Sequence, residues 1–145
     1  MIKIREGKIS DWEELLVLLN SSPELQSTPE GETYNKGFVK ATLKDKKRNV
    51  VLIVESEKKI VGFLTAEIWK DKKYSFLTDI LIKKRYRKKG IASKLFKEYE
   101  KICKKDNLQT IIGLVLVNNK KMQRLVEKSN YKKGNKFYLY QKKLK

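Results

Sequence analysis

The chain has 145 residues, of which 40% are hydrophobic and 36% are charged, and its formal net charge at pH 7 is +18. This composition is typical of a folded domain with a charged surface, so we expect one domain over residues 1–145. No apolar run approaches the roughly 20 residues of a membrane span, and the N-terminus lacks a signal-peptide core, which predicts a cytoplasmic protein without membrane contact. The chain has no histidine and a single cysteine, Cys103. Internal disulfides, Cys/His zinc sites and imidazole catalysis are therefore excluded, and we expect no metal site.

The charge is distributed unevenly along the chain. Residues 9–35, called the acidic segment below, contain no Lys or Arg and carry −6, so the rest carries +24 to give the total of +18. The acids of this segment are Asp11, Glu13, Glu14, Glu24, Glu30 and Glu32. Both prolines, Pro23 and Pro29, also lie here, which predicts an irregular connection between two helices.

The N-terminal part predicts a strand followed by two helices. Ile2 and Ile4 indicate a short first strand, and Ser10-Asp-Trp-Glu13 has the form of a capping box that opens a helix ending near Leu19. A second helix is predicted over residues 33–44, with its apolar side chains toward the core.

The rest of the chain passes from strands to helix and back. Three apolar runs joined by short polar connections predict an antiparallel meander at residues 50–55, 60–69 and 74–82. Apolar residues at helical spacing then predict a core-packed helix over 90–105, in which we expect Cys103 as a small buried hydrophobe. The remaining predicted elements are a buried strand at 110–117, a short helix at 120–128 and a last strand at 136–144.

A basic loop separates the third strand of the meander from the long helix, with the sequence IKKRYRKKGIASKLF over residues 82–96. A glycine at a helix start suits anions, because unpaired amides and the positive end of the helix dipole face outward there. The spacing of a Walker A loop and the three glycines of a dinucleotide fingerprint are both absent. The segment therefore predicts an anion site of another kind.

The sequence Arg87-Lys88-Lys89-Gly90-Ile91-Ala92 fits the Q/R-x-x-G-x-G/A signature of the GNAT superfamily of N-acetyltransferases, which it resembles. Ile80-Leu81-Ile82 stands where that family has a hydrophobic strand end, and NKKMQRLVEKSNY at 119–131 is similar to its N-x-x-A-x-x-L-Y-E-K-x-G-F element. The resemblance implies an α/β (α+β) fold with a mixed, mainly antiparallel sheet. In that fold a parallel strand pair splays apart, and about four helices flank the sheet.

The resemblance also implies acetyl-CoA as acyl donor. Its pyrophosphate would lie on the amides of residues 87–92, its pantetheine along 80–82, and Asn119 would contact it. Lys88, Lys89 and Arg124 are candidates for the 3′-phosphate by charge alone. The candidate donor-binding residues are thus Ile80, Leu81, Ile82, Arg87, Lys88, Lys89, Gly90, Ile91, Ala92, Ser93, Asn119 and Arg124.

Two positions depart from the family pattern. Asn130 replaces a glycine, which is a mild change because asparagine tolerates the left-handed conformation. Val126 replaces the tyrosine that commonly protonates the departing thiolate. Because a thiol titrates near 8.5, a thiolate leaving at pH 7 costs only about 2 kcal/mol, so the reaction is slowed and not forbidden. Tyr138 or Tyr140 is a candidate substitute, with a core role as the alternative for each.

The acceptor amine presents the larger barrier, since neutralising a lysine-like ammonium ion at pH 7 costs roughly 4 to 5 kcal/mol. The resemblance places Asp79 near the acceptor, and we expect it to take the proton or anchor the amine, with Glu67 as the reserve. For both, a solvent-facing strand position is the alternative.

In the family the first two helices wall the acceptor site, so the acidic segment favours a cationic acceptor. We expect this acceptor to attack acetyl-CoA directly in a ternary complex. Candidate acceptors are a polyamine, a lysine side chain, a peptide N-terminus or an amino-sugar, with Glu32 and Tyr34 in contact. The alternatives are a basic nucleic-acid-binding module and an inactive CoA-binding domain. Against the first, lysines spread over every element and outnumber arginine. The oligomeric state stays open, with a homodimer as one option.

Overall fold

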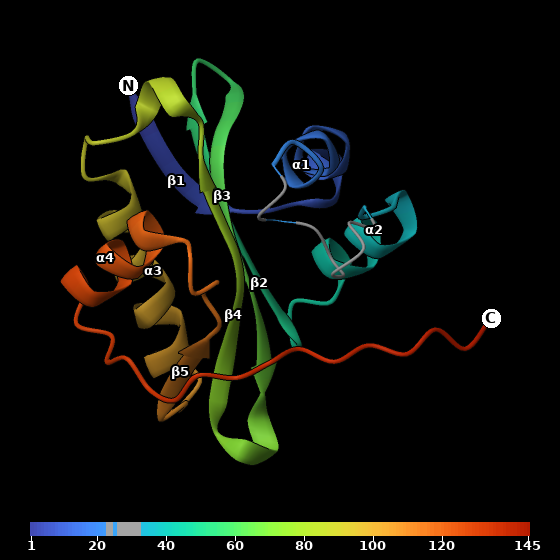
Figure 1. The fold of residues 1–145 in the computed structure, drawn as a ribbon. Coiled ribbons are helices and arrows are strands. Elements are labelled where there is room, and N and C mark those ends of the chain that lie inside the picture. The colour runs from blue at the N-terminus through green and yellow to red at the C-terminus, as the bar shows by residue number, and fades with distance from the viewer. Residues whose placement is uncertain (23–24, 26–32) are drawn as a thin grey trace.

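The computed structural model describes residues 1–22, 25 and 33–145. Its centre is one five-stranded sheet in which the strands follow the chain order (Figure 1). The strands are β1 (Ile2–Glu6), β2 (Asn49–Ser56), β3 (Lys59–Trp69), β4 (Tyr74–Ile82) and β5 (Thr110–Gly113). The first three pairings are antiparallel, whereas β4 and β5 are parallel.

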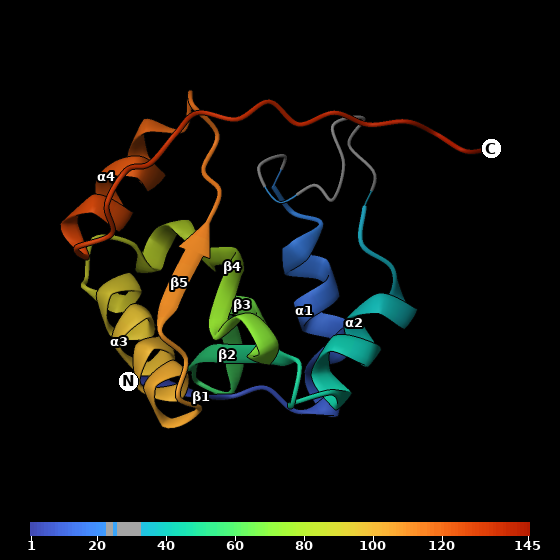
Figure 2. The same cartoon turned by 90° about the horizontal axis from the view of Figure 1, so that it is seen from below.

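Helices cover both faces of the sheet. Figure 2 shows α1 (Trp12–Leu19) and α2 (Lys36–Lys44) on one side, and α3 (Ile91–Lys105) and α4 (Lys120–Lys128) on the other. The predicted mixed sheet with a parallel pair and flanking helices is confirmed. The second helix begins later than predicted because the Asn35 side chain accepts a hydrogen bond from the Phe38 amide at 2.9 Å and caps it there.

Each layer of helices buries its own apolar face. On the side of α1 and α2, Leu15 and Val39 pack against sheet residues such as Phe63. On the side of α3, the core includes Phe96 and Cys103. Cys103 is 4% exposed, and burial raises the pKa of its thiol, so the expectation of a small buried hydrophobe is confirmed.

A buried chain of hydroxyl groups fixes α3 to the sheet. The Tyr99 hydroxyl donates to Ser75 Oγ at 2.6 Å, and Ser75 Oγ donates to the carbonyl oxygen of Glu67 at 2.7 Å. Since buried hydroxyls are costly when unpaired, these bonds favour one position of α3 on β3 and β4. The helix that follows the basic loop is therefore held in place.

The N-terminal cap differs from the prediction. The Ser10–Glu13 capping box is wrong, because Asp11 accepts a hydrogen bond from the Lys8 amide at 2.8 Å around a 3-10 turn (Ile9–Asp11). The two terminal guanidinium nitrogens of Arg5 also donate to Asp11, at 2.8 and 2.9 Å. Asp11 is 6% exposed, and a buried carboxylate needs such a partner.

The C-terminal part departs further from the predicted strands. The buried strand expected at 110–117 ends at Gly113, and residues beyond it such as Leu114 and Leu116 are exposed. The last strand expected at 136–144 does not form, and residues 131–145 run as an extended tail (Figure 1). The apolar pattern gives strand propensity, but a strand also needs a partner, and the tail has none in the described part of the chain. No helix of the described residues is long and apolar enough to cross a membrane.

Candidate functional site

A notch opens where the two parallel strands separate. β4 pairs with β5 only from Tyr74 to Leu77, opposite Thr110 to Gly113. β4 then continues to Ile82, whereas residues 114–117 leave the sheet, so one edge of β4 has no strand partner among the described residues. Main-chain groups at the carboxyl ends of parallel strands are a common place for ligands.

The predicted strand end, residues 80–82, lies at this notch. Ile80 and Ile82 are buried in the core under α3, and Leu81 packs on the opposite core under α1 and α2. Their side chains are thus engaged in packing. A ligand in the notch would meet the backbone of these residues.

The basic loop continues from the strand end. It forms a 3-10 turn (Lys84–Tyr86), and Arg87 Nε then donates to the carbonyl oxygen of Ile82 at 2.7 Å, which ties the loop back to β4. Lys88 and Gly90 have positive φ angles of 61° and 77°. A left-handed backbone conformation turns amides toward one side, as in known anion-binding loops.

The loop ends at the N-terminus of α3. Gly90 is the N-cap residue, and no described side chain caps this helix end. The amides of Ile91, Ala92 and Ser93 therefore lack partners within the helix. A Cβ atom added at Gly90 would meet no atom within 4 Å, so the space before the helix is open. Free amides, a positive helix end and open space together fit the pyrophosphate of a nucleotide-type ligand.

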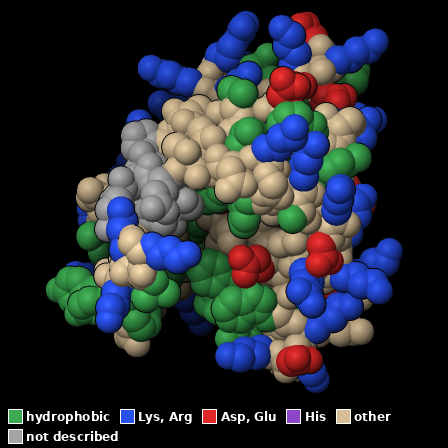
Figure 3. Space-filling view, turned by 90° about the vertical axis from the view of Figure 1, so that its right-hand side faces the viewer, with side chains coloured by type: hydrophobic (Ala, Val, Ile, Leu, Met, Phe, Trp, Pro, Cys, Tyr) green, Lys and Arg blue, Asp and Glu red, His purple; other side chains and the backbone are tan. Residues whose placement is uncertain are grey.

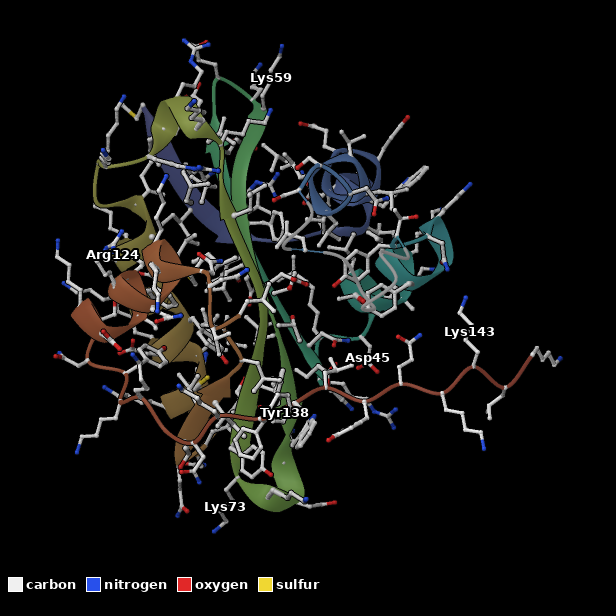
Figure 4. The ribbon with its side chains drawn as sticks, viewed as in Figure 1. Asp45, Lys59, Lys73, Arg124, Tyr138 and Lys143 are labelled. Carbon is white, nitrogen blue, oxygen red and sulfur yellow. The ribbon has the colours of Figure 1, made fainter. Side chains whose placement is uncertain are left out.

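The other candidate donor-binding residues lie on or before α4. Asn119 Oδ1 accepts from the Met122 amide at 3.1 Å and so caps α4. Arg124 is exposed on α4, which Figure 4 shows on the same side of the sheet as α3. Val126 packs against the core under α3, so that position of the helix carries no hydroxyl. Asn119 therefore has a structural role whatever it contacts in addition.

Asp79 lies two positions beyond the last β4 residue that pairs with β5. Its Oδ2 atom accepts a hydrogen bond from the Tyr34 hydroxyl at 3.0 Å, and Thr65 stands opposite it on β3. A β-bulge interrupts the β3–β4 register at this point, where Thr78 Oγ1 lies 2.8 Å from Thr65 Oγ1. Bulges often redirect a side chain beside a functional site. The fold thus brings together two predicted candidates, Asp79 and Tyr34, that lie far apart in sequence.

The surroundings change the proton affinity of this pair. Burial raises the pKa of the Asp79 carboxyl above its ordinary value, and the polar side chains of Tyr34 and Thr65 offset only part of that effect. Burial and the adjacent carboxylate raise the pKa of Tyr34, so its hydroxyl stays protonated and donates. Asp79 is therefore an oriented carboxylate that takes up a proton more readily than an exposed aspartate.

A carboxylate among aromatic rings lies farther along the same face. Glu67 faces Phe76 across the strands, and Trp69 Nε1 donates to Glu67 Oε1 at 3.1 Å. The Trp69 ring lies 5.9 Å from Phe76 and 5.4 Å from Tyr74, centroid to centroid. Figure 1 shows the β3–β4 hairpin reaching beyond α1 and α2, and Figure 3 shows acidic side chains beside hydrophobic ones in this region. We call Glu67, Trp69, Tyr74 and Phe76 the aromatic patch.

Two described acids of the acidic segment are engaged in other contacts. Asp11 is paired with Arg5, and Glu14 Oε2 accepts from the Ile60 amide at 3.0 Å. Glu24, Glu30 and Glu32 lie outside the described residues, so the Glu32 prediction stays a prediction. Among the described residues, the acids that face this region of the sheet are Asp79 and Glu67.

Tyr138 lies on the tail and is 87% exposed, outside any strand (Figure 4). Its role as a substitute for the tyrosine that is missing at position 126 stays a prediction. Sequence reasoning missed Thr65 and Trp69. Two signals were available in the sequence: Thr65 is a polar residue inside an apolar strand, and Trp69 stands two positions from the acid Glu67. Among the described residues, no group of three or more Asp, Glu or Cys side chains is placed to hold a metal ion.

Comparisons with known proteins identify the family and the fold. The model of the acetyltransferase (GNAT) family matches residues 12–131. Comparison with curated protein sequences gave no match.

Solved structures share the fold over nearly the whole chain. A possible acetyltransferase from Clostridium difficile 630 is 24% identical, with a TM-score of 0.74 and 97% of each chain covered. An aminoglycoside N-acetyltransferase in complex with CoA is 15% identical, with a TM-score of 0.81 and 97% of this chain and 99% of that chain covered. A ribosomal-protein-alanine N-acetyltransferase from Brucella melitensis biovar Abortus 2308 is 14% identical, with a TM-score of 0.77 and coverages of 97% and 98%. At these identities the likeness shows a common fold.

Proposed function

The chain belongs to the GNAT family of acetyltransferases, and we propose that it acetylates a cationic primary amine held against the β3–β4 face by Asp79. The enzyme is an acyltransferase, and acetyl-CoA is its acyl donor. Bound acetyl-CoA supplies an acetyl group activated as a thioester. The observation that carries the proposal is the Tyr34–Asp79 pair beside the notch between β4 and β5.

The donor is held mainly by backbone in this proposal. The amides of residues 88–92 bind the pyrophosphate, since the Arg87 amide donates to the Lys84 carbonyl oxygen, and the free edge of β4 at 80–82 bonds the pantetheine arm. Lys88 and Lys89 are exposed beside the loop and supply positive charge for the 3′-phosphate, with Arg124 as a further candidate. Arg87 acts through its bond to Ile82, which sets the loop conformation.

Asp79 handles the proton of the acceptor. Its carboxylate attracts the ammonium group, takes one proton from the nitrogen and so leaves a neutral amine that attacks the acyl carbon. The Tyr34 hydroxyl occupies one lone pair of Oδ2 and orients the carboxylate, which keeps further acceptor sites for the amine. The raised pKa of Asp79 favours this transfer. Because position 126 carries a valine, the thiolate departs without a proton from that helix position, at the cost of about 2 kcal/mol.

The aromatic patch favours an acceptor with a second positive charge. Glu67 stands two positions along β3 from Thr65, the residue opposite Asp79, and two strand positions span about 7 Å. A short diamine bridges such a separation between two carboxylates. The rings of Trp69 and Phe76 add cation–π attraction, worth about 0.5 to 2 kcal/mol. Among the candidate acceptors, these features support a polyamine.

An acceptor panel tests the proposed function. We expect acetyl-CoA to bind in calorimetry, and putrescine to be acetylated with a higher kcat/KM than butylamine, which lacks the second ammonium group. Glu67→Gln should reduce this preference for putrescine several-fold, whereas Asp45→Asn, which removes the charge of a half-buried acid at the end of α2, should leave it unchanged. Better turnover of neutral or acidic acceptors than of polycations would contradict the proposal. Absence of acetyl-CoA binding, together with salt-sensitive binding of DNA or RNA, would favour the nucleic-acid-binding alternative.

A further inference from the structure

A lysine of the chain itself lies on the aromatic patch. The 3-10 turn Lys70–Lys72 joins β3 to β4, and Lys72 Nζ lies over the Trp69 ring, 5.8 Å from its centroid. This distance is within the range of a cation–π contact. Trp69 is 39% exposed, so the contact is made at the surface of the patch. The patch thus already binds one ammonium group, and that group belongs to the protein.

The Trp69 ring is open to a cation from one side. The ring is stacked on that of Phe76, with an angle of 20° between the planes and 5.9 Å between the centroids. The hydrogen bond from Nε1 to Glu67 Oε1, at 3.1 Å, fixes the orientation of the indole. Because Phe76 covers one face of the indole, a cation reaches the other face. An external ammonium group therefore competes with Lys72 for it.

The turn keeps Lys72 close to the ring. Lys73 has a left-handed conformation with a φ of 57°, and its amide donates to the carbonyl oxygen of Lys70 at 3.0 Å. On either side of the turn, Trp69 pairs with Tyr74 across the hairpin. A tethered group has a high effective concentration at its contact. Lys72 is therefore a strong competitor although a single cation–π contact is weak.

The Trp69 ring lies farther from Asp79 than the second ammonium group of a short diamine reaches. Asp79 stands opposite Thr65, and Glu67 and Trp69 follow Thr65 on the same face of β3. The separation along the strand is about 7 Å to Glu67 and about 14 Å to Trp69. Putrescine reaches the nearer position, where Glu67 faces Phe76. The ring of Trp69 is positioned for a further ammonium group, as in spermine.

We propose that Lys72 occupies a third ammonium position over the Trp69 ring and so removes the advantage of long polyamines over short diamines as acceptors. The inference rests on the proposed function, in which Asp79 and Glu67 bind the first two ammonium groups. A further ammonium group gains a contact with the ring only by breaking the contact of Lys72, so the exchange yields little free energy. Lys72 is thus a specificity-determining residue, and it touches none of the reacting atoms.

The ratio of kcat/KM for spermine to kcat/KM for putrescine tests this role. Lys72→Ala frees the ring, and the ratio should rise about 3- to 10-fold. Lys70→Ala is the matched control, because it removes the same charge from the same exposed turn, whereas the ring contact is made by Lys72. In this control the ratio should rise by less than about twofold, since exposed charges interact weakly. Turnover of butylamine should stay the same in both variants, because this acceptor does not reach the ring.

A binding measurement separates this inference from the proposed function. The chain has two tryptophans, so Trp12→Phe leaves Trp69 as the fluorescent one. In this background and without acetyl-CoA, spermine should change the fluorescence of Trp69 at about 3- to 10-fold lower concentration when Lys72 is replaced by alanine. If no amine is acetylated, the proposed function fails, and this titration still decides whether Lys72 occupies the position.

Three results would overturn the inference. One is the same ratio of spermine to putrescine turnover in the wild type and in Lys72→Ala. Another is an equal rise in Lys70→Ala and Lys72→Ala, because the effect would then come from charge and not from occupation of the ring. The third is a spermine titration of Trp69 that is the same with and without Lys72. Circular dichroism should show unchanged helix content in the turn variants, since both side chains are exposed.

Discussion

The role of Asp79 leads to a quantitative prediction for the variant Asp79→Asn. Asparagine keeps the shape of the side chain and still accepts the bond from Tyr34, but it does not take a proton from the acceptor. The variant then depends on the small fraction of amine that is already neutral. With an amine pKa of about 10.4, this fraction at pH 7 corresponds to about 3.4 pH units, or about 4.6 kcal/mol. General base catalysis typically contributes 10²- to 10⁴-fold. We therefore expect kcat/KM at pH 7 to fall by about 10²- to 10³-fold.

The pH dependence distinguishes loss of a base from other damage. In the wild type the ammonium form reacts with the ionised carboxylate, so kcat/KM stays level between the pKa of Asp79 and that of the amine. It falls as the pH decreases through the Asp79 pKa, because the carboxyl becomes protonated. Since that pKa is raised, the fall begins above the usual range of aspartate. In Asp79→Asn, by contrast, kcat/KM should rise about tenfold per pH unit as neutral amine accumulates.

The assay follows release of the CoA thiol between pH 5.5 and 9, with calorimetry for acetyl-CoA binding. Donor affinity should stay within about twofold of the wild type, because the donor is held by backbone around Gly90 and not by Asp79. Asp45→Asn serves as the control for loss of one negative charge. A variant that retains turnover within threefold at pH 7, or that has the same pH slope as the wild type, would remove Asp79 from the reaction.

Three further perturbations test the parts of the structure around this reaction. Gly90→Ala places a side chain at a φ of 77° without a clash, so the variant opposes the binding conformation of the loop only by backbone strain of about 1–2 kcal/mol. Calorimetry should therefore show 5- to 30-fold weaker binding of acetyl-CoA. Gly90→Asn, which tolerates that conformation, should lose much less. Tyr34→Phe removes a hydrogen bond that lowers the pKa of Asp79, so the acid limb of the kcat/KM profile should move to higher pH, and an unmoved limb would show that Tyr34 does not set it. For Asp11, burial alone would raise the pKa, but the bonds from Arg5 and the Lys8 amide outweigh it and the pKa is lowered. The stabilisation is therefore present above the pKa of Asp11 in the unfolded state and is lost as the pH falls through its pKa in the folded state. Asp11→Asn should lower the free energy of unfolding, measured in urea at pH 7, by about 3 kcal/mol. The variant should also lose this dependence of stability on acid pH.

The sequence was sufficient for the elements that depend on local pattern. The helix over 120–128 and the strand over 74–82 agree with the structure to the residue, because apolar periodicity and flanking polar residues define both. The loop around Gly90 was also predictable, since a glycine at a helix start follows from local chain geometry. Interactions between distant residues were not predictable in this way. The bond from Tyr34 to Asp79 joins positions 45 residues apart, and the bulge that places Asp79 depends on the register of two strands.

The failures of prediction have a common physical cause. Strand propensity at 114–117 and 136–144 describes what a segment favours, whereas a strand forms only with a partner edge. Likewise, Ser10 fits a capping box by type, but Asp11 takes the cap because Arg5 compensates its buried charge. For Asp11 the deciding partner lies elsewhere in the chain, and local sequence pattern does not reveal it.

The net charge of +18 acts oppositely on the two substrates. It attracts the anionic donor toward every face of the protein, and it repels a cationic acceptor at long range. Recognition of the acceptor must therefore come from groups within a few ångströms. Salt screens charges weakly at such distances, because they are shorter than the Debye length of about 8 Å at physiological ionic strength. A partly buried carboxylate oriented by Tyr34 meets this requirement, and a diffuse acidic surface does not. Among the described acids, Asp79 and Glu67 are the two that the fold places on this face, and our proposal for the acceptor therefore depends on them.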